Sequence, residues 1–159
     1  MNEVAVVNAV CTRLNADTTL TGILTGGIDQ LRGPLRGLAV DGSAAYAVIV
    51  PTSANKGEHT QGSDGYWVNF RITIYDRQQN GLANLYAASK RIFGDASLSA
   101  ANSMVPTYGL HRHKLTLGSD ANGWLANTII CDGQEFDDTD DDVLSVTVYF
   151  NVHISRVPA

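Results

Sequence analysis

The segment from Leu144 to Ser155 constrains the fold most strongly, because apolar and polar side chains alternate through all of it. Successive side chains of a β-strand point to opposite faces of a sheet, so a period of two predicts a strand with one buried face. The apolar set is Leu144, Val146, Val148, Phe150, Val152 and Ile154. We therefore expect a half-buried strand over 144–155, with Phe150 in the core.

Other segments carry weaker strand signals. Residues 66–75 alternate in the same way, and residues 44–51 form an apolar run that Pro51 ends. These two strands are expected to pair antiparallel. Two further candidates are 105–117 and 123–132, separated by a turn-rich linker around "GSDANG". The connector at 28–43 is irregular, with room for one short strand.

Apolar residues at helical spacing predict three helical segments. Residues 3–15 carry a single stripe, and Asp17 or Thr18 can cap a second short segment that ends at Gly26 and Gly27. A central amphipathic helix is expected over 79–93, with an apolar face of Leu82, Leu85, Tyr86, Ser89, Ile92 and Phe93. The chain is thus predicted to be one α+β domain, 1–159, with an antiparallel or mixed sheet and helices on one face.

Charge is unevenly distributed along the chain. The net charge is −5, and six of the sixteen acids fall within 135–142, so the remainder is nearly neutral. Without a basic stripe, sequence-specific nucleic-acid binding is not expected, and no apolar run is long enough to span a membrane. Cys11 and Cys131 lack a partner motif. They are expected to be core thiols of a protein made in a reducing cytoplasm, with a disulfide as the alternative.

The acidic run "EFDDTDDD" (135–142) does not have the spacing of an EF-hand calcium loop. An EF-hand needs Gly at position 6 and a bidentate Glu at position 12. A loop starting at Asp138 has Val143 and Tyr149 at those positions, and a loop starting at Asp137 has Asp142 and Val148. Both registers fail, so we expect a solvated acidic loop at a sheet end. A looser cation site remains the alternative.

Candidate catalytic residues are sparse. His111 and His113 are two residues apart in a predicted strand, so their rings would share a face, and His153 lies on another strand. A zinc site needs at least three protein ligands, which this pair does not supply alone. Arg32 and Arg36 lie in a loop without the Lys-Ser/Thr ending of a phosphate loop. No cofactor and no enzymatic activity are expected.

The polar segment "TSANKGEHTQGSDG" separates the two expected hairpin strands. Its composition leaves little to bury, so residues 52–65 are expected to form a long arm that becomes ordered only on assembly. Lys56, Glu58 and His59 are the candidate contact residues within it.

A family resemblance rests on four stretches of the sequence and on their order. They are "NADTTLTGILTGGI" (15–28), "YAVIVP" (46–51), "FRITIYDRQQNGLANLYAASKRIFGD" (70–95) and "VLSVTVYFNVHIS" (143–155). The succession of helix, hairpin, helix and closing strands resembles the tail-terminator (tail-completion) proteins of long-tailed bacteriophages. The resemblance covers roughly residues 3–155. The run of aspartates departs from that layout.

The resemblance implies a structural virion protein, made in the host cytoplasm, that forms a ring of six copies. The ring would cap the tail tube and join it to the head, so its partners would be other copies, the major tail tube protein and a head–tail connector or neck protein. Such a protein has no catalytic centre. The second set of candidate contact residues is Asp137, Asp138, Asp140, Asp141 and Asp142. The alternative function is a metal-dependent binding module or hydrolase that uses the acidic loop at 135–142.

Overall fold

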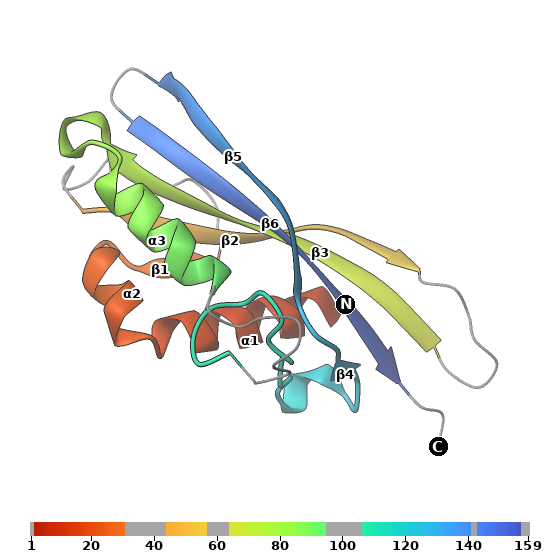
Figure 1. Ribbon diagram of the computed structural model, residues 1–159. Helices are drawn as coiled ribbons and strands as arrows, with labels where there is room; N and C mark the ends of the chain where they lie inside the picture. Colours follow the sequence, from red (N-terminus) through yellow and green to blue (C-terminus); the bar gives the residue numbers. More distant parts are fainter. Residues whose placement is uncertain (1, 31–43, 57–63, 95–105, 141–142, 157–159) are drawn as a thin grey trace.

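Strand β6 (Val143–Arg156) organises the sheet of this protein, which is described by a computed structural model (Figure 1). The structure describes residues 2–30, 44–56, 64–94, 106–140 and 143–156. β6 pairs antiparallel with β3 (Asp64–Arg77) along its whole length, from Val143 opposite Arg77 to Arg156 opposite Asp64. The alternation that predicted this strand is confirmed, because its side chains are alternately intermediate and buried up to Ser155.

The remaining strands extend the sheet on both sides. β2 (Tyr46–Lys56) pairs antiparallel with β3, which confirms the expected hairpin. The short strand β1 (Ile28–Gln30) pairs parallel with β2 and makes the sheet mixed. At the other side, β4 (Leu125–Ala126) and β5 (Ile130–Asp140) both pair antiparallel with β6. The order is β1-β2-β3-β6-β4, with β5 also on β6.

Helices α1 (Asn2–Asn15), α2 (Thr18–Ile23) and α3 (Ala83–Phe93) pack on one side of this sheet (Figure 1). Asp17 caps α2, because its carboxylate accepts from the backbone N–H groups of Thr19 and Leu20. A 3-10 turn (Gln78–Asn80) precedes α3, so the helix begins later than residue 79. The buried face of α3 is also narrower than the predicted apolar face, since Leu82 and Tyr86 are exposed.

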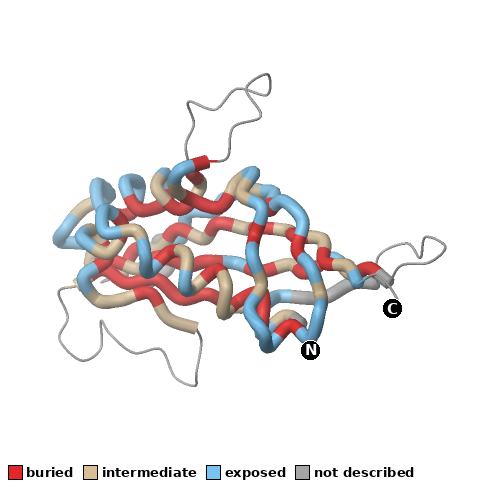
Figure 2. The backbone as a smooth tube through the Cα atoms, turned by 90° about the horizontal axis from the view of Figure 1, so that it is seen from below, coloured by how far each residue is buried: buried red, intermediate tan, exposed pale blue. Residues whose placement is uncertain are grey.

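The core lies between the helices and the even-numbered side chains of β3 and β6. Phe70 and Phe150 are both fully buried and stack with ring centroids 5.4 Å apart. Helices α1 and α3 contribute Val6, Val10, Leu14, Leu85 and Ile92 to the same cluster. In Figure 2 the buried positions recur along the helices and the central strands. Burial of the apolar face of the helices against the apolar face of the sheet therefore holds the two layers together.

A buried aspartate fixes the connection between β3 and α3. Asp76 is 0% exposed and accepts hydrogen bonds from the Arg77 backbone N–H at 2.8 Å, Asn80 Nδ2 at 2.8 Å and Asn84 Nδ2 at 3.3 Å. A buried carboxylate is tolerated only where its oxygens have such donors. Asp76 therefore ties the end of the strand to the start of the helix.

The predicted strand at 105–117 is wrong within the described residues 106–117. This segment consists of bends and turns with a single bridge between Lys114 and Thr128. Gly109 has a φ of 80°, and a Cβ there would lie 2.1 Å from Gly94 Cα, so close backbone packing against the end of α3 shapes the loop. Leu110 and Leu115 are buried by the loop fold instead of by a strand ladder.

The predictions for residues 52–65 and 123–142 need correction. β2 continues to Lys56 and β3 starts at Asp64, so pairing with a neighbouring strand extends into both ends of the expected arm. The candidate at 123–132 is two strands, β4 and β5, and β5 continues to Asp140. The first part of the acidic run is thus an edge strand and not a loop, because β6 supplies a backbone partner for it.

Cys11 and Cys131 are half-buried free thiols that pack against the core, and burial raises the pKa of both. None of the described helices is both long enough and apolar enough to cross a membrane.

The Phe70–Phe150 stack gives the first prediction. Phe150→Ala should lower the free energy of unfolding by about 3–5 kcal/mol, because it leaves a cavity in the core. Tyr149→Phe, at the neighbouring position on the other face, should change it by less than about 0.5 kcal/mol. Urea denaturation of both variants measures this. Equal effects would mean that the two faces of β6 are assigned the wrong way round.

The hydrogen bonds of Asp76 give the second prediction. Asp76→Ala should destabilise the fold by about 1–3 kcal/mol, because the Arg77 N–H and two amides lose a buried acceptor. Asp132→Ala, at an exposed position, is the matched control and should stay within about 0.5 kcal/mol of wild type. Thermal or urea unfolding distinguishes the two. If both behave alike, the β3–α3 connection does not depend on Asp76.

Candidate interaction surfaces

The first part of the acidic run, from Glu135 to Asp140, lies on β5. Glu135 and Asp137 are exposed and opposite Thr147 and Ser145 of β6. Asp138 and Asp140 belong to the same strand, but their side chains, and all of Asp141 and Asp142, lie outside the described residues. Within the described strands β5 pairs only with β6, so its outer side is a free strand edge. Charged side chains on such an edge discourage pairing with other sheets.

The face of the sheet turned away from the helices is polar near β5. A cavity of about 330 Å³ lies on this face, lined by residues of β3, β5 and β6 that include Arg71, Thr73 and Asp137. The Tyr149 hydroxyl donates to Glu135 Oε2 at 3.1 Å, and this hydrogen bond raises the pKa of Tyr149. Thr73 and Thr147 share a hydrogen bond of 3.0 Å across the strands. Four of the polar residues that line this cavity are thus paired with one another.

The candidate residues of the arm are only partly described. Lys56 lies in β2 opposite Tyr66, with no description of its side chain, and Glu58 and His59 lie outside the described residues. Their role in contacts with other molecules stays a prediction.

The histidines do not form the expected pair. His111 and His113 lie in a turn, where Arg112 has a φ of 68°, so they share no strand face. His111 Nδ1 accepts from the Cys131 N–H at 3.0 Å, and its ring stacks on Phe93. Burial lowers the pKa of His111 and of His113, which favours the neutral rings.

His153 lies on β6, and its partners are not the other two histidines. Its Nδ1 is 3.2 Å from Asn127 Nδ2, and its ring contacts the edge of Trp67. Across the part of the chain that the structure describes, no three His, Cys, Asp or Glu side chains gather as a metal site would require. His111 and His153 instead make hydrogen bonds within the protein.

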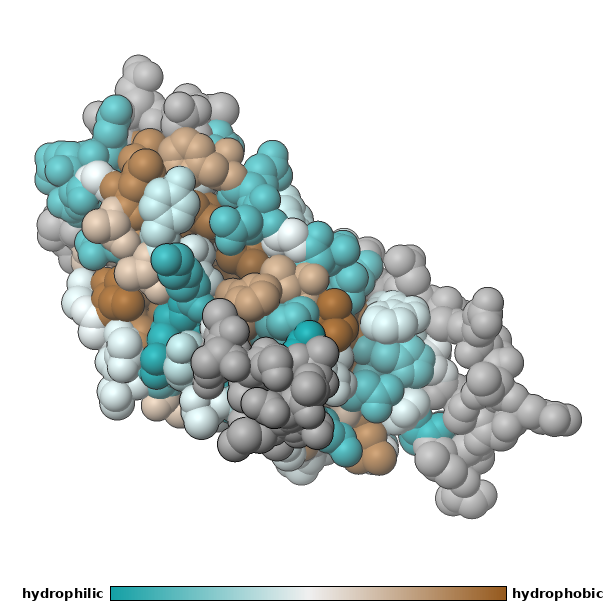
Figure 3. Space-filling view, viewed as in Figure 1, coloured by the Kyte–Doolittle hydropathy of each residue, from teal (hydrophilic) through white to brown (hydrophobic). Residues whose placement is uncertain are grey.

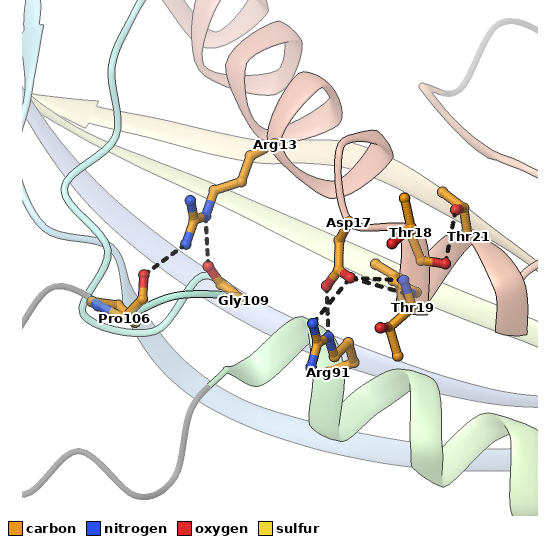
Figure 4. Close-up of polar contacts among 9 residues, drawn as sticks. Arg13, Asp17, Thr18, Thr19, Thr21, Arg91, Pro106 and Gly109 are labelled. Atoms are coloured by element: carbon orange, nitrogen blue, oxygen red, sulfur yellow. Dashed lines mark hydrogen bonds and ion pairs between the residues drawn. The ribbon is translucent and has the colours of Figure 1, made fainter.

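A groove of about 850 Å³ lies between α1, the end of α3 and the loop after residue 106. Figure 4 shows Arg13 reaching this loop and Arg91 reaching Asp17. Arg13 Nε donates to the Gly109 carbonyl at 2.8 Å and Nη2 to the Pro106 carbonyl at 3.2 Å. The guanidinium thus holds the loop against α1.

Arg91 makes a bidentate contact with Asp17, the N-cap residue of α2. Its Nε lies 2.7 Å from Asp17 Oδ2 and its Nη2 3.2 Å from Oδ1, while its Cζ lies 3.6 Å from the ring centroid of Tyr108. Such paired hydrogen bonds are strong and directional. The cap was predicted from sequence, but its partner is 74 residues away and has no local signal. Both arginines in the groove are therefore structural ties between elements.

Comparison with known proteins identifies a shared fold. No family model matches the sequence, and no curated protein matches it either. Among solved structures, the chain is similar to a chain of the "Virion of native gene transfer agent (GTA) particle". The two have a TM-score of 0.67 and 18% sequence identity, and the match covers 95% of each chain. At this identity the likeness establishes the common fold over nearly the whole length.

The Asp17–Arg91 pair predicts a pH dependence. Burial raises the pKa of Asp17, but the hydrogen bonds from Arg91 and from the Leu20 and Thr19 N–H groups outweigh it, so the pKa is lowered overall. A lowered folded-state pKa gives stability that is present above the unfolded value of about 3.9 and lost as pH falls through the folded value. Asp17→Asn keeps a helix cap but removes the charge.

Wild type should therefore be more stable than Asp17→Asn at pH 7, and the difference should shrink between about pH 4 and pH 2. Urea denaturation across this range measures it, and exposed Asp132→Asn is the control. A constant difference at all pH values would mean that the ionised Asp17 contributes no net stability.

Proposed function

We propose that this protein is a structural virion protein that forms a ring, caps the tail tube of a phage and joins the tube to the head. The observation that carries the proposal is the fold shared with a virion chain over nearly the full length of both chains. The order of elements, which resembles the tail-terminator proteins, supports the same role.

The internal chemistry of the chain also favours a structural role. In the groove, Arg13 and Arg91 bind the protein's own carbonyl and carboxylate groups. On the open face of the sheet, Tyr149 binds Glu135 and Thr73 binds Thr147. A catalytic site instead needs a nucleophile, acid or base held ready for a substrate. The described polar groups hold elements together, as a subunit of an assembly requires.

The proposed partners are other copies of this chain, the major tail tube protein and a head–tail connector or neck protein. A ring of six identical subunits requires two different complementary surfaces on each subunit. We assign contacts with these partners to the β2–β3 connection, with Lys56, Glu58 and His59, and to the acidic end of β5. The residues at that end are Asp137, Asp138, Asp140, Asp141 and Asp142.

Deletion of the coding sequence from the genome that carries it tests this function. Electron microscopy of the lysate should show heads and tails that are not joined, and expression of wild type from a plasmid should restore joined particles. As a second readout, mass spectrometry of purified particles should detect the protein. Normal particles in the deletion lysate would contradict the proposal.

A further inference from the structure

The sequence contains two Asn-Gly pairs, Asn80–Gly81 and Asn122–Gly123, and the structure holds them differently. Asparagine is chemically labile, most of all before glycine, because the following backbone nitrogen then approaches the side-chain amide without hindrance from a side chain. Both asparagines are exposed, and a Cβ added at either glycine would meet nothing within 4 Å. Exposure and crowding therefore do not distinguish the two pairs.

The reaction at such a pair begins at the backbone nitrogen of the glycine. This nitrogen gives its proton to hydroxide and attacks Cγ of the asparagine. A new C–N bond closes a five-membered succinimide ring, while the bond from Cγ to Nδ2 breaks and the nitrogen leaves as ammonia, with a proton from solvent. Water then opens the ring at either carbonyl and gives aspartate or isoaspartate. The reaction consumes only water, and it needs a glycine N–H and an asparagine amide that are both free to move.

Both reacting groups are held at Asn80–Gly81. The Gly81 N–H donates to the Gln78 carbonyl at 3.0 Å across the 3-10 turn. Asn80 Nδ2, the nitrogen that would leave, donates at 2.8 Å to the buried carboxylate of Asp76. Hydrophilic side chains gather at the corner of the molecule that precedes α3 in Figure 3, so this region is open to water. Any protection of the pair therefore comes from its hydrogen bonds.

The pair Asn122–Gly123 forms a tight turn in which neither reacting group is held. The φ angles of 52° and 84° are both positive, as a type I′ turn requires, and Asn-Gly is a preferred sequence for that turn. The Trp124 N–H closes the turn by donating to the Ala121 carbonyl at 3.1 Å. Within the part of the chain that the structure describes, the Gly123 N–H and the Asn122 side-chain amide have no hydrogen-bond partner.

We propose that Asn122–Gly123 is a site of spontaneous deamidation in the folded protein, whereas Asn80–Gly81 is protected until its local structure opens. Asn80–Gly81 must first lose two hydrogen bonds, one of them to a buried carboxylate, and this should slow its conversion about tenfold or more relative to Asn122–Gly123. The proposal is independent of the proposed function, because the chemistry requires only the fold and water.

Conversion at Asn122–Gly123 would alter the start of β4. Isoaspartate carries the backbone through its Cβ, so it lengthens the turn by one atom and removes the geometry that closes it. Trp124 follows the turn directly, with its ring centroid 5.1 Å from that of Tyr66 and 5.7 Å from Arg156 Cζ. Leu125 and Ala126 come next and pair with β6. The modification should therefore loosen Trp124 and β4 from the sheet.

Peptide mapping of aged protein tests the proposal. Folded wild type is incubated in warm, mildly alkaline buffer, and tandem mass spectrometry of proteolytic peptides follows conversion at both pairs. Asn122 should convert about tenfold or more faster than Asn80, since only the latter is held by two hydrogen bonds. In urea the two rates should become similar, because unfolding releases both pairs. Mildly acidic buffer should slow conversion at Asn122, since the attacking nitrogen must lose its proton.

Three variants separate the two sites. Asn122→Gly tolerates a positive φ and should abolish the acidic species that anion exchange resolves from aged protein. Asp76→Ala frees Asn80 Nδ2 and should speed conversion at Asn80 several-fold. Asn84→Ala is the matched control, because it removes a different donor to the same carboxylate and should leave the Asn80 rate unchanged. In the isoaspartate fraction of wild type, hydrogen exchange should be faster over 121–126 and unchanged over 78–90.

Four results would overturn the proposal. The first is conversion of Asn80 as fast as that of Asn122 in the folded protein. The second is an Asn122 that stays intact in the folded protein while the unfolded chain converts. The third is a difference between the sites that persists in urea, because its cause would then lie in the sequence and not in the fold. Unchanged hydrogen exchange over 121–126 in the isoaspartate fraction would reject the loosening of β4.

Discussion

The pairing of β6 with β3 is the interaction on which the rest of the structure depends. It runs from Val143 to Arg156 without a register shift, and the other two described strands on that side, β4 and β5, both pair with β6. Because the two strands are in register, Phe150 meets Phe70 and the apolar sides of both strands form one surface for the helices. The same register sends Thr147 and Thr73 to the opposite face, where they bind each other. One pairing thus defines the core and the open face together.

The helices and strands that could be predicted are those whose own sequence shows the pattern of the element. The strand at 144–155 follows from its alternation, and α1 follows from its apolar stripe, since each pattern directly specifies which side chains face the core. The extension of β5 to Asp140 has no such signal, because aspartate is poorly suited to strands. That strand forms because β6 offers an unpaired edge. The segment 105–117 shows the opposite case: a strand is expected there, but Arg13 and the contact between Gly94 and Gly109 hold a loop that buries Leu110 and Leu115.

The candidate surfaces were less predictable than the fold, and α3 shows why. Its sequence predicts burial of Leu82 and Tyr86 together with Leu85, Ser89 and Ile92. The rotation of the helix about its axis, however, is set by partners outside the helix: Arg91 with Asp17, 74 residues away, on one flank and Asn84 with the buried Asp76 at the start. With small residues Ala88 and Ser89 against the sheet, the buried face is narrow and the outer flank stays exposed. A local pattern determines that a helix is amphipathic, but distant partners decide which borderline residues are covered.

The distribution of charge connects these features to assembly. Outside 135–142 the chain is nearly neutral, so the net negative charge of the protein resides in this run. An edge strand of this length could pair with a copy of itself, and repulsion between the acids opposes that pairing. Charge on this strand edge therefore disfavours direct edge-to-edge pairing of two copies.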